Sequence, residues 1–340
     1  MALAARGAWR TPPPPLSLSK DELATALPFL CRSGAGALAW WRLRQHGLAR
    51  TPAGRELHDM YLLHGFEGQV RAVQLANALA RLRGAGIEPL LVKGWAIARQ
   101  YPEVGLRPYS DIDLIVPSDA YDRARAALAV GPALGIVVDL HAGTEQLDSR
   151  SFEDLDARAE EAVLGHTTVR VLAPEDHLRV LSLHLLRHDA CRPIWLVDLA
   201  VALESRRPTF DWARCLGTDR RRGEWVACGI GLAHRLLGAD VTGTPAAARA
   251  ADLPRWLVAA VLRRWNSLTA CVSAHLPLGQ AWPSLARDPV RLWEALALRW
   301  DRPISYTLER RRSFSRWPRW PIQAASIALR APRIVHELRH

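Results

Sequence analysis

The sequence predicts an α+β protein in which a small mixed sheet lies between an N-terminal helical segment and a C-terminal helical domain. Apolar residues recur at helical spacing before residue 85 and again over most of the chain after Arg150. Between these regions, short apolar runs alternate with short helical patterns, in the order strand, helix, strand, helix, strand from Ile87 to Gly143. We therefore expect three regions: residues 1–85, 86–172 and 173–340, the last ending in a basic tail.

Two long helices are expected ahead of the sheet. Apolar residues are spaced as in helices from Ser19 to His46 and from Arg55 to Arg83. The second pattern stops at Gly84-Ala85-Gly86, because glycine there ends a helix readily. The chain then enters the region of the predicted strands.

Three short strands and two connecting helices are expected next. IEPLLVKG is strand-like up to Gly94, and WAIARQY after it is typical of a short helix. DIDLIV is a strand that ends at Pro117, and Ser118 caps a helix that runs through Leu128. GIVVDLHAG has the apolar run of a buried strand, and TTVRVL is a further strand candidate.

Helices dominate the rest of the chain. PEDHLRVLSLHLLRH begins with proline and two acidic residues, which favour the first turn of a helix. Further helices are predicted at Pro193–Ser205, Glu224–Leu237, Pro254–Arg264 and Arg291–Trp300.

Composition limits the kinds of protein that this chain can be. With 340 residues, of which 49% are hydrophobic, it can bury a sizeable core. We expect neither a membrane span nor a secretory signal, because no apolar run is long enough for either. The five cysteines form no C-x-x-C pair, so reduced thiols and a cytoplasmic location are expected.

Positive charge is concentrated at the C-terminus. The net charge is +11, and residues 301–340 hold nine arginines against Asp301, Glu309 and Glu337. In this tail, ERRRSFSRWPRWP interleaves arginine with Trp317 and Trp320, a combination that can meet a nucleic-acid backbone or an anionic membrane surface. A solvated arginine-rich terminus is the alternative.

Paired carboxylates are the main indication of chemistry. Residues two apart on a strand point to the same face, so Asp111 and Asp113 project together while Ile112 and Leu114 face the other way. Two negative charges at such a short distance repel each other, but they are tolerated when a divalent cation lies between them. Carboxylate oxygens are hard ligands, which favour Mg²⁺ or Mn²⁺. Asp139, on the later strand, is a candidate third ligand.

Lys93 is an exceptional basic residue in this chain. Of its 45 basic residues only Lys20 and Lys93 are lysines, and Lys93 stands in the turn ahead of the carboxylates. Lysine offers a compact point charge where arginine offers a planar fork, which suits contact with one phosphate oxygen in a tight turn.

These motifs resemble the DNA polymerase beta-type nucleotidyltransferase superfamily, and within it a bacterial family of uncharacterised nucleotidyltransferases that has a KG turn. The resemblance covers about Arg71 to Asp240, and the turn here is Lys93-Gly94-Trp95 where glycine and serine are commoner in the superfamily. The segments that carry it are LLVKGWAIARQY, RPYSDIDLIV, VVDLHA, PEDHLRVLSLHLLRH and WLVDLAVAL.

The resemblance implies a task for each residue of the site. Asp111 and Asp113 would bridge metal ions on the triphosphate of a donor, and Asp139 would hold the ion that activates an acceptor oxygen. Backbone amides of the Gly94 turn would approach phosphate, and Lys93 would neutralise its charge. Arg107 and Ser110, in the loop before the second strand, are further candidates for contact with the nucleotide donor.

Three histidines are weaker candidates. His184 and His188 share one helix face, but the glutamate of the H-E-x-x-H zinc motif is missing, so a contact with substrate and a structural hydrogen bond both stay open. His141 points to the same face as Asp139 and is a candidate partner of that carboxylate. Asp198 is expected to form an interior salt bridge or hydrogen bond.

The function predicted from these residues is nucleotidyl transfer from an NTP to a small-molecule, peptide or protein acceptor. Sugar transfer from a nucleotide-sugar at the same metal site is one alternative, and a non-catalytic nucleotide-binding or antitoxin-like module is another. The signatures of P-loop NTPases, Rossmann dehydrogenases and serine hydrolases of the G-x-S-x-G type are missing from the sequence.

Overall fold

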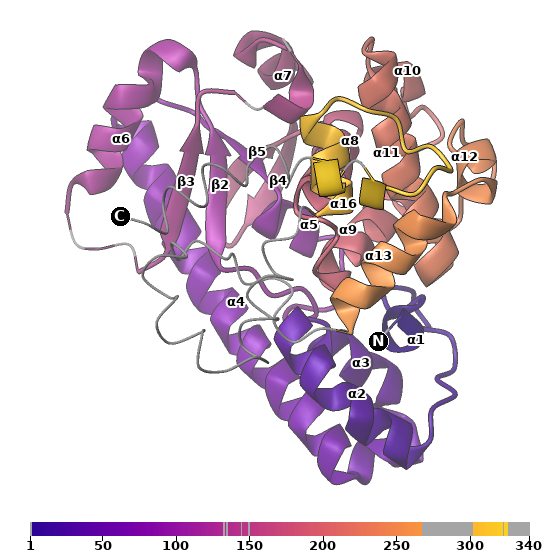
Figure 1. Ribbon diagram of the computed structural model, residues 1–340. Coiled ribbons are helices and arrows are strands. Elements are labelled where there is room, and N and C mark those ends of the chain that lie inside the picture. Colours follow the sequence, from indigo (N-terminus) through magenta and orange to yellow (C-terminus); the bar gives the residue numbers. More distant parts are fainter. Residues whose placement is uncertain are drawn as a thin grey trace, which may run out of the picture.

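The computed structural model describes residues 2–266, apart from 132, 134, 144 and 149, and residues 302–325, apart from 322. It has the predicted α+β fold, with N-terminal helices, a five-stranded mixed sheet and a C-terminal helical region (Figure 1). The helix predicted at Arg291–Trp300 lies outside the described residues.

The N-terminal region contains more helix breaks than the sequence predicted. Its helices are α1 (Ala2–Ala5), α2 (Lys20–Ser33), α3 (Gly36–Leu43) and α4 (Pro52–Gly84), with a 3-10 turn at Gly47–Arg50. The single helix predicted over residues 19–46 is two helices, because Gly34 adopts a left-handed conformation with φ of 78° and ends α2. Ser19 and Glu22 form the capping box that begins α2.

The long helix α4 belongs to two hydrophobic cores. At its N-terminal end Leu57 packs with α2 and α3, and at its C-terminal end Leu75, Leu79 and Leu82 pack against the sheet. One helix therefore contributes to both cores, and they are not separated at its C-terminal end. The domain boundary expected at residue 85 stays a prediction.

The sheet brings together strands that are far apart in the chain. The order is β3-β2-β1-β5-β4, in which β2 pairs parallel with β3, β1 pairs parallel with β5, and the β1–β2 and β4–β5 pairs are antiparallel. The strands are β1 (Leu90–Val92), β2 (Asp111–Ile115), β3 (Val137–His141), β4 (Glu160–Leu164) and β5 (Thr167–Val171). All predicted strands are present, and β5 confirms the TTVRVL candidate. The prediction that GIVVDLHAG is a buried strand was wrong, because β3 lies at the edge of the sheet and Val137 is 69% exposed.

Strand β4 was missed by the sequence analysis. It begins with Glu160 and Glu161, and Val163 is one of the most exposed large hydrophobic residues, so its apolar pattern does not alternate as in a half-buried strand. Its pairing with β5 through the turn at Gly165 makes it a strand. Here tertiary pairing outweighs local pattern.

Helices cover both faces of the sheet. On one face α4 and α6 (Tyr121–Ala129) pack against Ile112 and Leu114, which face away from the carboxylates as predicted. On the other face α7 (Phe152–Arg158) and α8 (Pro174–Arg187) contribute Leu155 and Val180 to a small core with β1 and β2. Two short elements complete this region, α5 (Gly94–Ala98) and a 3-10 turn at Ser118–Ala120.

The helical region after the sheet is built around a large core at α8 and α9, to which N-terminal residues such as Trp9 and Trp41 also contribute. The helices predicted at 193–205, 224–237 and 254–264 are present, although a π turn at Ala233–Leu237 extends α11 where one continuous helix was expected, and α12 and α16 were not predicted. They are α9 (Pro193–Glu204), α10 (Trp212–Leu216), α11 (Arg220–Leu232), α12 (Ala247–Ala251), α13 (Arg255–Trp265) and α16 (Pro303–Glu309). Among the described residues, no helix is both long enough and apolar enough to cross a membrane.

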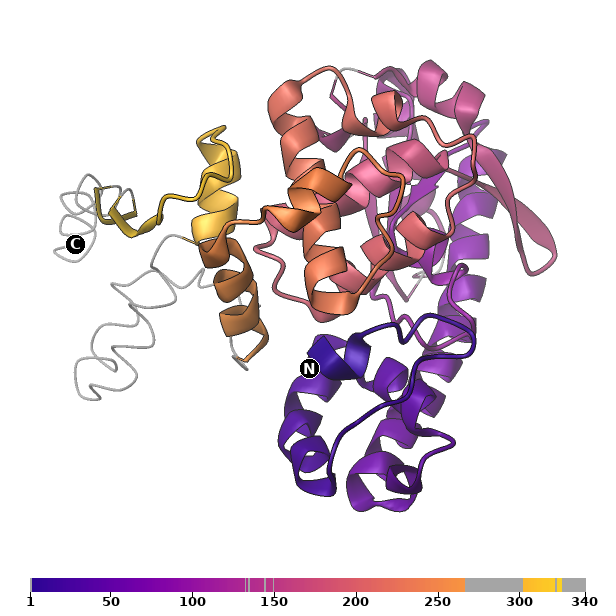
Figure 2. The same cartoon turned by 90° about the vertical axis from the view of Figure 1, so that its right-hand side faces the viewer.

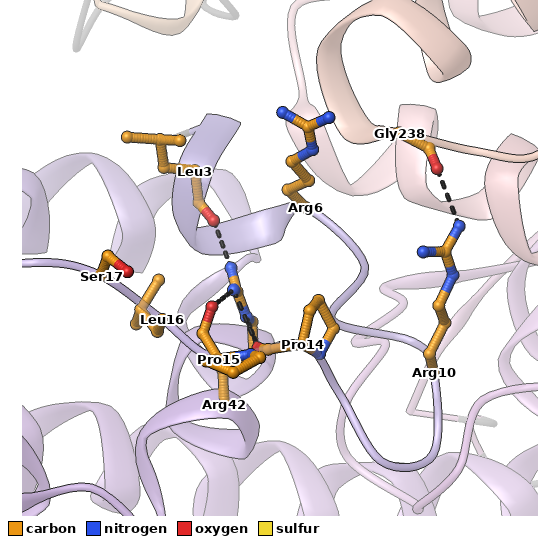
Figure 3. Close-up of a pocket in the computed structure, with 9 residues that line it drawn as sticks. All are labelled: Leu3, Arg6, Arg10, Pro14, Pro15, Leu16, Ser17, Arg42 and Gly238. Atoms are coloured by element: carbon orange, nitrogen blue, oxygen red, sulfur yellow. Dashed lines mark hydrogen bonds between the residues drawn. The ribbon is translucent and has the colours of Figure 1, made fainter.

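Arginines attach the N-terminal segment to the rest of the molecule. A pocket of about 270 Å³ lies where this segment meets Gly238 (Figure 3). Arg10 donates a hydrogen bond to the Gly238 carbonyl at 2.7 Å and forms an ion pair with Glu204. Arg42 donates to backbone carbonyls of the segment, those of residues 3, 4, 14 and 15. The guanidinium groups therefore satisfy carbonyls that secondary structure leaves unpaired.

Candidate functional site

The pairing of β2 with β3 brings the predicted carboxylates together. In the parallel register Asp113 lies beside Asp139, and Ile115 lies beside His141. Because side chains alternate along each strand, Asp113, Asp139 and His141 all project from the face of the sheet that α8 covers. The two strands thus deliver three polar groups to one side of the sheet.

These three residues form a group that could hold a metal ion. Their ligand atoms lie within 4.8 Å of one another. His141 Nε2 is 3.2 Å from Oδ2 of Asp139 and 3.5 Å from Oδ1 of Asp113, so the imidazole stands between the two carboxylates. Two carboxylates with an imidazole are a donor set that accepts Mn²⁺ as well as Mg²⁺.

Asp111 lies next to this group without being one of its three members. Burial, followed by the charge of Asp113, raises the pKa of Asp111, and the positive charges of Lys93 and Arg107 only partly offset this. A raised pKa means that the folded protein disfavours the ionised form of Asp111. This is expected where neighbouring negative charges are not fully balanced by positive ones.

Asp113 is the most buried carboxylate of the site, with 3% of its surface exposed. Burial alone raises the pKa of Asp113, but the contact with His141 and the charge of Lys93 outweigh burial, so the pKa lies below its usual value. Lys93 forms an ion pair with Oδ1 of Asp113. The ammonium therefore meets this oxygen directly, and His141 Nε2 lies 3.5 Å from the same atom.

Lys93 has a backbone conformation that is rare for residues other than glycine. Its φ is 50° and its ψ is −147°, close to a region that only glycine adopts readily. The backbone N–H of Lys93 donates a hydrogen bond to Nε2 of His177 at 3.2 Å, and the carbonyl accepts one from Ile97. Contacts from α8 and α5 therefore hold the strained turn.

Gly94 lets the turn approach the second strand closely. It is buried, with φ of 37°, and a Cβ at this position would lie 3.3 Å from the carbonyl oxygen of Asp111. Any other residue would push the turn and β2 apart. Ser110, just ahead of β2, is exposed.

His177 was not singled out in the sequence analysis, although it belongs to PEDHLRVLSLHLLRH. Burial, followed by the charges of Arg99, Arg107 and Lys93, lowers the pKa of His177 to about 3. The imidazole is therefore neutral at neutral pH, and since Nε2 accepts the Lys93 N–H, Nδ1 must carry the proton. A histidine near the start of a buried helix gives no signal of this contact in the sequence alone.

His184 and His188 lie together with a tryptophan beside the carboxylates. Their rings are 4.6 Å apart between centroids, and that of Trp195 is 4.9 Å from His184. Burial, followed by the charge of Lys93, lowers the pKa of both histidines, that of His184 well below its usual value. Since Asp113 also acts on the pKa of His184, this aromatic group lies within electrostatic reach of the site.

Arg107 is held in a buried ion pair. Its guanidinium donates to both carboxylate oxygens of Asp198, at 2.7 Å for the shortest bond, and to the carbonyl of Pro108. Tyr101 donates to the same carboxylate at 2.7 Å. Burial lowers the pKa of Arg107, but the charge and hydrogen bonds of Asp198 outweigh burial and raise it. Asp198 has the interior role that the sequence predicted, and Arg107 acts on Asp111 through its charge.

A pocket of about 280 Å³ opens beside the carboxylates. It is lined by Val92, Lys93, Ile115, His141, Gly143, Gln146, Val180 and Arg187. The walls combine apolar strand residues with Lys93, Arg187 and His141. A pocket with cations on one wall and carboxylates beside it suits a phosphorylated ligand that brings a divalent ion.

The chain is similar to a known protein family. The model of a family described as uncharacterised nucleotidyltransferase matches residues 21–238, which is most of the chain and includes every residue of the site described above. No curated protein and no solved structure matches the chain.

Proposed function

Since the chain belongs to this family of uncharacterised nucleotidyltransferases, it is a transferase, and we propose that it moves a nucleotidyl group from an NTP to a small-molecule, peptide or protein acceptor with the help of Mg²⁺ or Mn²⁺. The observation that carries the proposal is the group of Asp113, Asp139 and His141, whose ligand atoms lie within 4.8 Å of one another. Asp111 projects from the same strand face and adds a fourth candidate ligand.

The residues present fit a divalent ion. Asp113, Asp139 and His141 present ligand atoms that converge within 4.8 Å, and the lowered pKa of Asp113 keeps that carboxylate ionised at neutral pH. The raised pKa of Asp111 points the same way, because a bound cation would favour the carboxylate. When bound, the ion supplies charge neutralisation on the donor phosphates and activation of the acceptor oxygen.

The remaining residues bind and orient the donor. Lys93 lies at the pocket wall as a point charge for one phosphate oxygen, and the Gly94 turn brings the backbone close to β2. His177, through its bond to the Lys93 N–H, keeps the turn in that conformation. In the reaction the acceptor oxygen forms a bond to the α-phosphorus, the bond from that phosphorus to the β-phosphate oxygen breaks, and pyrophosphate and a proton are released.

Two alternatives keep the same residues in other roles. Sugar transfer from a nucleotide-sugar would use the same carboxylates and metal but release a nucleoside diphosphate. A non-catalytic nucleotide-binding or antitoxin-like module would bind nucleotide without turnover. The convergence of Asp113, Asp139 and His141 beside a pocket favours an active site, because groups with shifted pKa values cluster where chemistry takes place.

The test is to incubate the protein with Mg²⁺ or Mn²⁺, each NTP or nucleotide-sugar and a mixture of candidate acceptors, and to identify the products by mass spectrometry. We expect metal-dependent pyrophosphate release that Asp113→Asn abolishes and the exposed control Asp122→Asn retains. Release of a nucleoside diphosphate would replace the proposal by sugar transfer. Metal-dependent nucleotide binding that no acceptor converts to product would replace it by the binding module.

A further inference from the structure

The segment after α16 displays two tryptophans that remain largely exposed in the part of the chain that the structure describes. Trp317 is 79% exposed and Trp320 is 66% exposed, and Trp317 is the most exposed large hydrophobic residue among those described. Burying an indole is strongly favourable, so a folded protein rarely leaves two of them in water a few residues apart.

The turn that carries these tryptophans is firmly anchored. Phe314 is fully buried and its ring packs on Trp256. The indole N–H of Trp256 donates to the carbonyl of Ser315 at 2.8 Å, and that of Trp225 donates to the carbonyl of Arg312 at 2.8 Å. The exposure of the two tryptophans is therefore a property of an ordered turn.

Arginines surround the tryptophans. The described residues from 302 to 325 contain six arginines and one acidic residue, Glu309. Three of these arginines form ion pairs: Arg302 pairs with the buried Asp189, whereas Arg311 and Arg316 are exposed, so their pairs with Asp219 and Asp252 contribute little. Arg221 on α11 contacts the carbonyl of Arg311 and adds its charge to the same surface.

We propose that this surface, consisting of Trp317, Trp320 and the exposed arginines at 310–312 and 316, docks the protein on an anionic membrane. Indole rings prefer the boundary between headgroups and acyl chains, and arginines beside them bind headgroup phosphates. Figure 2 shows the yellow segment projecting from the helical region on the side away from the sheet. A projecting turn can bring both rings to a flat surface at once, whereas a single-stranded nucleic acid is bound in a groove that follows its backbone.

The full chain should co-sediment with vesicles of phosphatidylcholine and phosphatidylserine, less with phosphatidylcholine alone, and less as salt is raised. Replacing both tryptophans, Trp317→Ala with Trp320→Ala, should weaken binding on the order of tenfold. Arg312→Gln and Arg316→Gln should each weaken binding to the anionic vesicles by about fivefold. Phe66→Ala and Arg125→Gln are matched controls, because Phe66 and Arg125 are equally exposed on α4 and α6.

Circular dichroism and thermal unfolding of each variant check that the fold is intact. Transferase turnover with soluble substrates should be unchanged in the double tryptophan variant, so this test is independent of the proposed function. Vesicle binding that is equal for wild type and the double variant would overturn the proposal. Binding to a single-stranded oligonucleotide without binding to vesicles would also overturn it and assign the surface to nucleic acid.

Discussion

The backbone of Lys93 can be tested separately from its charge by comparing two substitutions. Lys93→Gly and Lys93→Ala both remove the ammonium and leave Asp113 without its ion pair, so that loss cancels in the comparison. The variants differ in the backbone alone, because alanine at φ of 50° and ψ of −147° keeps the strain and glycine relieves it.

The size of the difference follows from two opposing effects. Strain of this kind costs about 2 kcal/mol. Glycine costs about 0.7 kcal/mol more than alanine through the entropy of the unfolded chain. Lys93→Gly should therefore be more stable than Lys93→Ala by about 1.3 kcal/mol, the reverse of the usual order.

Urea unfolding of both variants measures this difference. Arg123, exposed within α6, is the control position, and there alanine should be more stable than glycine by about 1 kcal/mol. Turnover should be strongly reduced in both Lys93 variants. If alanine proves as stable as glycine at position 93, the turn is not held in the strained conformation and the account of His177 as its support is wrong.

Three further predictions concern the same site. Without metal at pH 7, Asp111→Asn should stabilise the fold because the pKa of Asp111 is raised, and Asp113→Asn should destabilise it because the pKa of Asp113 is lowered. Urea unfolding measures both changes in unfolding free energy, and Mn²⁺ titration calorimetry should show weakened binding in each variant. Changes of the same sign in the two variants would contradict the charge arrangement. Lys93→Ala should lose about 2 to 4 kcal/mol of transition-state stabilisation in kcat/KM, and Lys93→Arg should not restore it; full rescue by arginine would mean that charge alone suffices. His177 has a pKa of about 3 in the folded protein and about 6.5 in the unfolded chain, so the unfolded chain binds the proton first as the pH falls. This should lower the unfolding free energy by about 2 kcal/mol between pH 7 and pH 5. His177→Gln should reduce the pH dependence of the unfolding free energy by that amount, and an unchanged pH dependence would refute the buried neutral imidazole.

The part of the site that depends on local pattern could be predicted from the sequence. The alternation along β2 was enough to separate Asp111 and Asp113 from Ile112 and Leu114, and an acid on a neighbouring strand was enough to propose Asp139. The register, which sets Asp113 directly beside Asp139, follows from pairing that no local pattern determines.

Contacts across long separations were beyond the sequence. Arg107 and Asp198 are 91 residues apart, and only the packing of α9 against the loop before β2 explains why this arginine is buried in an ion pair. His177 is 84 residues from Lys93 and meets it through a backbone N–H, a group that every residue but proline carries. Because any residue other than proline could donate this hydrogen bond, the identity of residue 93 does not predict it.

Strand β3 forms one edge of the sheet and pairs only with β2 among the described strands. Two of the three members of the carboxylate–imidazole group, Asp139 and His141, thus depend on a single ladder of hydrogen bonds, while Asp113 lies on an interior strand. Edge strands open at lower free energy than the middle of a sheet. A brief local opening of β3 would therefore separate Asp139 and His141 from Asp113 without unfolding the protein. If an ion binds there as proposed, the affinity for the ion and the hydrogen-exchange protection of β3 should be linked, because binding stabilises the strand that carries the ligands.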